Sequence, residues 1–258
     1  MINGINSREM ILEILLEIEE GEHSHVAIRN ALSKYQFLPK QDRAFITRVC
    51  EGTLEYRIQI DYIINSFSKV TVDKMKPAIR EILRSAVYQL KYMDSVPDSA
   101  VCNEAVKLAQ RKGFYNLKPF VNGVLRTIAR EMDQVRFPQK EDDLLKYLSV
   151  KYSMPEVLVT RWLEAYGEET TEKILADFLM EHPLTIRCRT YLNSKEEIVK
   201  SLESQGVHVA PAPYLSYAYS ISEFNHILAL DAFIKGKIVV QDVSSMLVAE
   251  VADPKKGD

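Results

Sequence analysis

The stretch that decides the fold is residues 96–130, VPDSAVCNEAVKLAQRKGFYNLKPFVNGVLRTIAR. Pro97 suits the first turn of a helix, because proline lacks an N–H that would stay unpaired there, and Gly113 suits the position just after the last turn. After Gly113, apolar residues recur at the three- and four-residue spacing of one helix face. They are Phe120, Val121, Val124, Leu125, Ile128 and Met132. The stretch therefore predicts two consecutive helices joined by a short turn.

The same helical spacing extends upstream to the N-terminus. It predicts five further helices, over roughly residues 7–20, 23–35, 39–54, 61–67 and 75–92. Residues 1–137 are therefore predicted to form an all-helical domain. The polar segment 137–142 is the expected domain boundary. Three short helical patterns, over residues 144–150, 155–166 and 168–179, predict a helical linker over residues 138–180.

From residue 181 the pattern becomes extended. Short β-type segments predict strands near 184–189, 207–209, 214–221 and 237–240, with a helix that begins after Ser194 between the first two. Strand, helix, strand, strand predicts a small α+β domain over residues 181–258. The fold class expected for the whole chain is mainly α.

Composition excludes several classes of protein. No apolar run approaches the roughly 20 residues of a membrane span, so no membrane association is expected. The chain has three cysteines, too few and too far apart for a disulfide framework, which predicts a cytoplasmic location. Its nine glycines are never closer than ten residues, so a P-loop or a Rossmann fingerprint is excluded. We expect no metal site, because no cysteine or carboxylate accompanies His23 and His25 at ligand spacing.

Basic residues are concentrated in the helical part. Residues 23–140 hold 20 Lys and Arg against 11 Asp and Glu, a net charge of +9, whereas the whole chain carries −3. Such a block indicates a polyanionic partner, although a solvated helix surface explains the charge equally well. The candidate RNA-binding residues are the bases spaced along helix faces and an aromatic residue in the turn. They are Arg80, Arg84, Lys107, Arg111, Lys112, Phe114, Lys118, Arg126 and Arg130.

Two short motifs in residues 96–130 resemble those of a known family. The motifs Asn103–Ala105 and Phe120–Gly123 resemble those of the NusB-type RNA-binding domain. So does the segment at residues 41–67, QDRAFITRVCEGTLEYRIQIDYIINSF. The resemblance implies an all-helical fold that binds RNA. Within it, Asn122-Gly123 is expected to allow the close approach of a neighbouring helix.

The continuation of the chain resembles a second family. LSVKYSMPEVLVTRWLEAYGEE (148–169), LTIRCRT (184–190) and GKIVVQDVSSMLVAEVADPKKGD (236–258) follow the order found in the Sun-type (Fmu, RsmB) 16S rRNA cytosine-C5 methyltransferases. This resemblance covers essentially the whole chain. It departs at Arg189, where the family usually has asparagine.

The resemblance implies that the chain is the N-terminal portion of such an enzyme. In the family, the Rossmann-like domain that binds S-adenosylmethionine and the two catalytic cysteines lie further on, and Cys50, Cys102 and Cys188 match neither cysteine. No catalytic or cofactor-binding residue is therefore expected here, and S-adenosylmethionine is expected only in the intact enzyme. A helix over 243–251 would lack a sheet to pack on, so Met246, Leu247 and Val251 are expected to be partly exposed.

Three functions remain open from the sequence. The first is the rRNA-recognition portion of a methyltransferase that uses S-adenosylmethionine, in which a cysteine thiolate would add to C6 of cytosine. The second is a non-catalytic NusB-like RNA-binding factor in transcription or ribosome assembly. The third is a helical scaffold with no nucleic-acid role. RNA binding separates the first two functions from the third.

Overall fold

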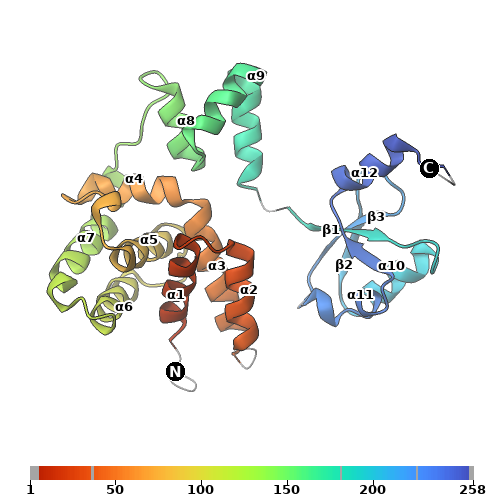
Figure 1. Ribbon diagram of the computed structural model, residues 1–258, viewed down its shortest axis with the longest axis horizontal. Coiled ribbons are helices and arrows are strands. Elements are labelled where there is room, and N and C mark those ends of the chain that lie inside the picture. The colour runs from red at the N-terminus through yellow and green to blue at the C-terminus, as the bar shows by residue number, and fades with distance from the viewer. Residues whose placement is uncertain (1–5, 36–37, 181, 225, 256–258) are drawn as a thin grey trace. The chain divides into compact units, whose positions relative to one another are not determined.

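The computed structural model describes residues 6–35, 38–180, 182–224 and 226–255. It divides the chain into two compact units, Met1–Leu179 and Met180–Asp258 (Figure 1). The first unit is helical and the second combines strands with helices. This architecture confirms the predicted fold class of a helical domain followed by a small α+β domain. The two units are described separately below.

Seven helices of the first unit share one hydrophobic core. They are α1 (Ser7–Glu19), α2 (Ser24–Lys34), α3 (Lys40–Glu55), α4 (Arg57–Phe67), α5 (Pro77–Tyr92), α6 (Asp98–Arg111) and α7 (Lys118–Glu131). Helix α5 contacts α1, α3, α4, α6 and α7, and it buries Ile79, Ile82 and Leu83 almost completely. Because apolar side chains face inward from every helix, burial of this shared core is the main stabilising contribution to the bundle.

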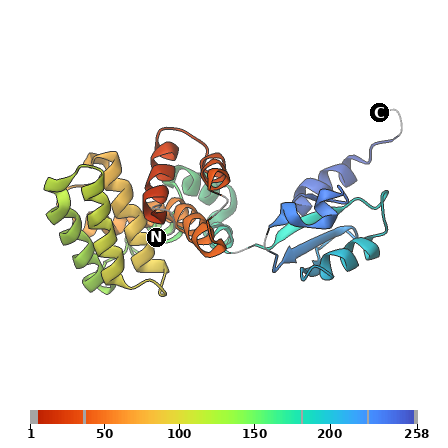
Figure 2. The same cartoon turned by 90° about the horizontal axis from the view of Figure 1, so that it is seen from below.

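Helices α5, α6 and α7 run side by side in both views (Figures 1 and 2). Helix α7 buries Val121, Val124, Leu125 and Ile128, the apolar face expected from the sequence. The turn between α6 and α7 consists of Gly113, at φ +84°, and the 3₁₀ helix η2 (Tyr115–Leu117). A glycine adopts this left-handed conformation without the strain that a side chain adds. The short turn keeps the outer faces of α6 and α7 adjacent.

The last helices of the first unit have a smaller core of their own. After the 3₁₀ helix η3 (Met132–Gln134), helices α8 (Leu144–Tyr152) and α9 (Glu156–Phe178) bury Leu148, Val159 and Leu175 against one another. Helix α9 is kinked at Gly167, at φ +73°, where the sequence pattern separates two helices. The Ser153 hydroxyl accepts a hydrogen bond from the Ile58 N–H at 3.0 Å. This bond ties the end of α8 to the first turn of α4.

The second unit is built on a four-stranded antiparallel sheet. Its strands are β1 (Leu184–Cys188), β2 (His208–Pro211), β3 (Ala218–Ser222) and β4 (Ile238–Val240), in the order β2-β3-β1-β4. Ile186 lies at the centre, in register with Tyr219 on one side and Val240 on the other. Helix α10 (Lys195–Glu203) follows β1, and the short helices η4 (Ile227–Ala229) and α11 (Asp231–Ile234) precede β4. The sequence pattern did not predict α11.

Helix α12 (Val243–Ala252) corrects one expectation. Met246 is buried, with 1% exposure, whereas Val248 and Val251 are 68% and 84% exposed. The Tyr217 hydroxyl donates a hydrogen bond to Glu250 at 2.5 Å, which ties α12 to the segment before β3. The expectation was therefore wrong for Met246. The last three residues of the quoted segment 236–258 lie outside the described residues.

Candidate nucleic-acid interface

One arginine, Arg126, contacts both of the motifs that resemble the NusB family. The Arg126 guanidinium donates to the side-chain carbonyl of Asn122, one turn back on α7, at 2.9 Å. It also donates to the side-chain carbonyl of Asn103 on α6, at 3.2 Å. Asn103 was not among the candidate residues, although its position in the motif Asn103–Ala105 could have indicated a functional role. Together these bonds hold a cation at the centre of the outer α6–α7 face.

Further bases lie on the same two helices. The Lys118 ammonium donates to Gln110 at 2.9 Å, a second link between α6 and α7. Lys107 is paired with Glu104 at 2.7 Å, and this hydrogen bond is the main cause that lowers the pKa of Glu104. Arg130 is paired with Glu131 at 2.7 Å, and its side chain is 72% exposed. Because exposed ion pairs contribute little free energy, a phosphate can compete for these cations.

The bases at the end of α6 face α1. Lys112 lies 3.4 Å from Glu9 and 3.0 Å from Glu13, and Arg111 lies 3.9 Å from Glu9. Lys112 is thus held between two carboxylates, whereas Arg111 makes only a long contact and its side chain is 42% exposed. Arg111 is therefore better placed than Lys112 to contact a ligand.

Arg80 and Arg84 are not part of this surface. Arg80 donates to the carbonyls of Val72 and Met75 and pairs with Glu19. Arg84 donates to both carboxylate oxygens of Asp61, at 2.7 and 2.6 Å, and to Glu81 at 2.5 Å. Their side chains are only 14% and 12% exposed. Both arginines hold helices of the bundle together, so their donors are already occupied, and we leave them out of the proposed surface.

The turn between α6 and α7 offers one exposed ring. Phe114 is half-buried against the bundle core, and the Lys76 ammonium lies 5.4 Å from the centre of its ring. Tyr115 is 61% exposed. A base that stacks at this turn would therefore meet Tyr115 more readily than Phe114. We define the α6–α7 surface as Asn103, Lys107, Arg111, Tyr115, Lys118, Asn122, Arg126 and Arg130.

Gly123 also belongs to this face, and its expected role was wrong. A Cβ added at Gly123 would meet nothing within 4 Å, so no neighbouring helix approaches there. The close approach is at Gly52 in α3, where an added Cβ would overlap the Tyr88 ring of α5. Gly123 is exposed in the interior of α7, where glycine costs about 1 kcal/mol relative to alanine. It leaves the backbone beside Asn122 and Arg126 open to a ligand.

The cysteines do not suit nucleophilic chemistry. Cys50, Cys102 and Cys188 are all buried, and burial raises the pKa of each thiol, to about 11 for Cys188. A thiol with a raised pKa carries almost no reactive thiolate at neutral pH. No group of three or more His, Cys, Asp or Glu among the described residues could hold a metal ion. Within the same residues, no helix combines the length and the apolar character that crossing a membrane requires.

The described residues also do not fit S-adenosylmethionine. Such cofactors bind at the carboxyl ends of parallel strands, beside a glycine-rich turn. The sheet of the second unit pairs its strands only in antiparallel fashion, and the glycines are dispersed. We therefore expect isothermal titration calorimetry of this chain with S-adenosylmethionine to show no saturable heat. Binding in the micromolar range would contradict this assignment.

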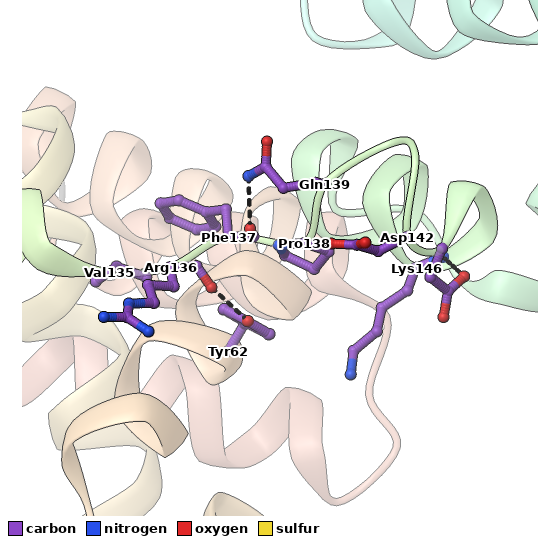
Figure 3. Close-up of a pocket in the computed structure, with 9 residues that line it drawn as sticks. Tyr62, Val135, Arg136, Phe137, Pro138, Gln139, Asp142 and Lys146 are labelled. Atoms are coloured by element: carbon purple, nitrogen blue, oxygen red, sulfur yellow. Dashed lines mark hydrogen bonds between the residues drawn. The ribbon is translucent and has the colours of Figure 1, made fainter.

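The segment between η3 and α8 forms a site that the sequence pattern did not indicate. Figure 3 shows Tyr62 beneath it, with the hydroxyl donating to the Arg136 carbonyl at 2.7 Å. The Tyr62 and Phe137 rings stack with their centres 5.8 Å apart. Gln139 donates to the Phe137 carbonyl at 2.9 Å. These contacts fix the segment against α4 and leave open hollows on either side of Phe137.

Two family models match successive parts of the chain. The NusB family model matches residues 5–130, and the model of the Methyltr_RsmF/B-like, ferredoxin-like domain matches residues 154–227. Transcription antitermination protein NusB of Dictyoglomus thermophilum is 33% identical over 130 residues, which are 50% of this chain and 85% of that protein. The chain therefore belongs to the NusB family through its first unit.

Longer proteins share the order of the two domains along the chain. The probable ribosomal RNA small subunit methyltransferase B of Bacillus subtilis is 32% identical over 97% of this chain and 55% of its own length. The crystal structure of PH0851 has the same fold, with a TM-score of 0.72 at 24% identity over 99% of this chain and 57% of that one. The chain thus begins with a NusB domain, as the resemblance implied, and the small domain expected after it is an RsmF/B-type ferredoxin-like domain. It spans little more than half the length of these relatives.

Proposed function

We propose that this chain is the RNA-recognition portion of an rRNA cytosine-C5 methyltransferase that uses S-adenosylmethionine. The observation that carries the proposal is the domain order, which the chain shares over 97% of its length with ribosomal RNA small subunit methyltransferase B relatives. A cysteine thiolate and the methyl donor would be supplied outside the described residues. The described residues would bind and orient the substrate RNA.

The α6–α7 surface is the proposed contact with RNA. Its bases come from two adjacent helices, and Arg126 is oriented by two asparagine carbonyls. Arginine and lysine side chains on helix faces suit phosphate contacts, which position RNA without reading its bases. The exposed Tyr115 ring and the bare backbone at Gly123 would let an unpaired nucleotide approach closely.

A non-catalytic NusB-like factor is the second candidate. The NusB match over residues 5–130 favours it, but that match leaves the second half of the chain unexplained. The ferredoxin-like match over residues 154–227 favours the methyltransferase portion instead. RNA binding is common to both candidates, so the test of the surface applies to either.

Replacing Arg111, Arg126 and Arg130 together with alanine is expected to weaken binding to an rRNA fragment. Each lost phosphate contact should lower the magnitude of the slope of log K against log salt by about one unit. Fluorescence anisotropy at several salt concentrations measures both the affinity and the slope.

A matched control carries the same loss of charge elsewhere in the first unit. Arg29, Arg57 and Arg161 are exposed, and no described side chain pairs with their guanidinium groups. Their triple alanine variant should bind almost as tightly as the unmodified chain. Equal losses in the two triple variants would place the RNA contact away from the α6–α7 surface.

A further inference from the structure

A half-buried ammonium without an anion lies where α5 meets the segment before α8. Lys91, in the last turn of α5, lies 5.3 Å from the centre of the Phe137 ring and 5.6 Å from that of Tyr92. No described carboxylate lies within ion-pair distance of it, and Asp133 acts on it only from further away. Burial lowers the pKa of Lys91. Because a desolvated charge without a counter-ion is unfavourable, an arriving anion would stabilise this ammonium.

Lys91 faces a hollow that contains a second lysine. The hollow has a volume of about 260 Å³. Its lining residues are Gln59, Lys91, Phe137, Pro138, Gln139, Tyr147 and Lys151. The Lys151 ammonium lies 2.6 Å from the Tyr147 hydroxyl and 3.0 Å from Glu172, which is not in the lining. Two lysines from two helices therefore line the hollow, and no carboxylate lines it. Glu172 neutralises Lys151 from outside the lining, so Lys91 is the cation of this hollow that lacks a described counter-ion.

A larger hollow of about 600 Å³ adjoins the first across Phe137, Pro138 and Gln139 (Figure 3). It carries two exposed bases, Arg136 and Lys146, and no described residue pairs with either side chain's charged group. It also carries two acids, of which Asp143 caps α8 by accepting from the Lys146 N–H at 3.0 Å. Because these acids offset the bases, the inference rests on the smaller hollow.

We propose that the hollow between Lys91 and Lys151 holds a phosphate group of the bound RNA strand. This inference rests on the proposed RNA-binding function and adds a contact point outside the α6–α7 surface. Lysine ammonium groups bind phosphates as point charges, without a fixed geometry. The alternative occupant is an acidic protein segment, and the experiment separates the two.

The test compares Lys91→Met with Lys69→Met. Methionine keeps an unbranched apolar stem and removes the charge, and Lys69 is an exposed lysine at the end of α4 with no described partner. We expect Lys91→Met to weaken binding of an rRNA fragment by roughly threefold to tenfold and to lower the salt slope by about 0.7 to 1 unit. Lys69→Met should change neither quantity. Thermal unfolding of both variants controls for folding.

The outcomes distinguish this inference from the proposed function. If the unmodified chain binds RNA and Lys91→Met matches Lys69→Met, the hollow is not a phosphate site, while RNA binding stands. If the unmodified chain does not bind RNA, the proposed function fails and this inference fails with it. If Lys91→Met weakens binding of poly-glutamate but not of RNA, the hollow belongs to an acidic peptide and the proposal is overturned.

Discussion

Replacing Arg84 with methionine is expected to lower the free energy of unfolding of the first unit by about 3 kcal/mol. Arg84 is the counter-ion of Glu81, whose side chain is only 4% exposed. Burial raises the pKa of Glu81 even though Arg84 lies 2.5 Å away, so this carboxylate depends on the guanidinium to stay ionised. Without Arg84, a buried carboxylate would lose its principal partner. Urea unfolding followed by far-UV circular dichroism, which reports the helices of the bundle, measures the change.

Two controls sharpen this prediction. Arg130→Met removes an arginine whose side chain is 72% exposed and paired with Glu131, and it should change stability by no more than about 0.5 kcal/mol. The double variant Arg84→Met with Glu81→Leu should recover about 2 kcal/mol, because the buried charge has gone. Asp61 also loses its partner Arg84 in this double variant, but its side chain is 21% exposed and water can still solvate it. A cost below about 1 kcal/mol for Arg84→Met would show that the pair does not hold the bundle.

Replacing two different glycines with alanine is expected to change stability in opposite directions. Gly52→Ala is expected to cost about 2 kcal/mol, because the new methyl group would overlap the Tyr88 ring, which is 6% exposed and cannot move freely. Gly123→Ala should instead stabilise the first unit by about 1 kcal/mol, since alanine favours the helix and the space around Gly123 is open. The same urea experiment measures both changes.

Repeating Gly52→Ala in a Tyr88→Val variant tests whether the contact with the Tyr88 ring causes the loss of stability. With the ring removed, Gly52→Ala should cost little or nothing, because the methyl group then has room. A cost of about 2 kcal/mol that persists in this background would assign the effect to the backbone of α3 rather than to the contact with Tyr88. If Gly123→Ala destabilised the unit, the open space described beside α7 would be contradicted.

Much of the fold could be predicted because local signals agree with tertiary packing. The apolar face of α7 and the punctuation by Gly113 and Gly167 are visible in the sequence, and the structure follows them. The short helix α11 could not be predicted, since a four-residue helix has no measurable period and ends at the turn before β4. The burial of Met246 was missed because the helical pattern of residues 243–251 does not show which of its apolar side chains the rest of the unit covers.

The candidate site was predicted less completely, for a physical reason. Arg80 and Arg84 have the same four-residue spacing as Arg126 and Arg130, so the sequence does not distinguish a structural pair from an exposed pair. The difference lies in partners on other helices, such as Asp61 in α4, which the fold brings to Arg84. The hollow beside Lys91 is likewise formed by α4, α5, α8 and the segment between η3 and α8. No local pattern records such an arrangement.

Amide NMR of the labelled chain, titrated with an rRNA fragment, tests most directly whether RNA binds on the α6–α7 surface as we propose. We expect the largest changes in chemical shift at Asn103, Lys107, Asn122, Gly123 and Arg126, with smaller changes near Lys91. Saturable changes confined to the second unit, or to α2 and α3, would contradict it.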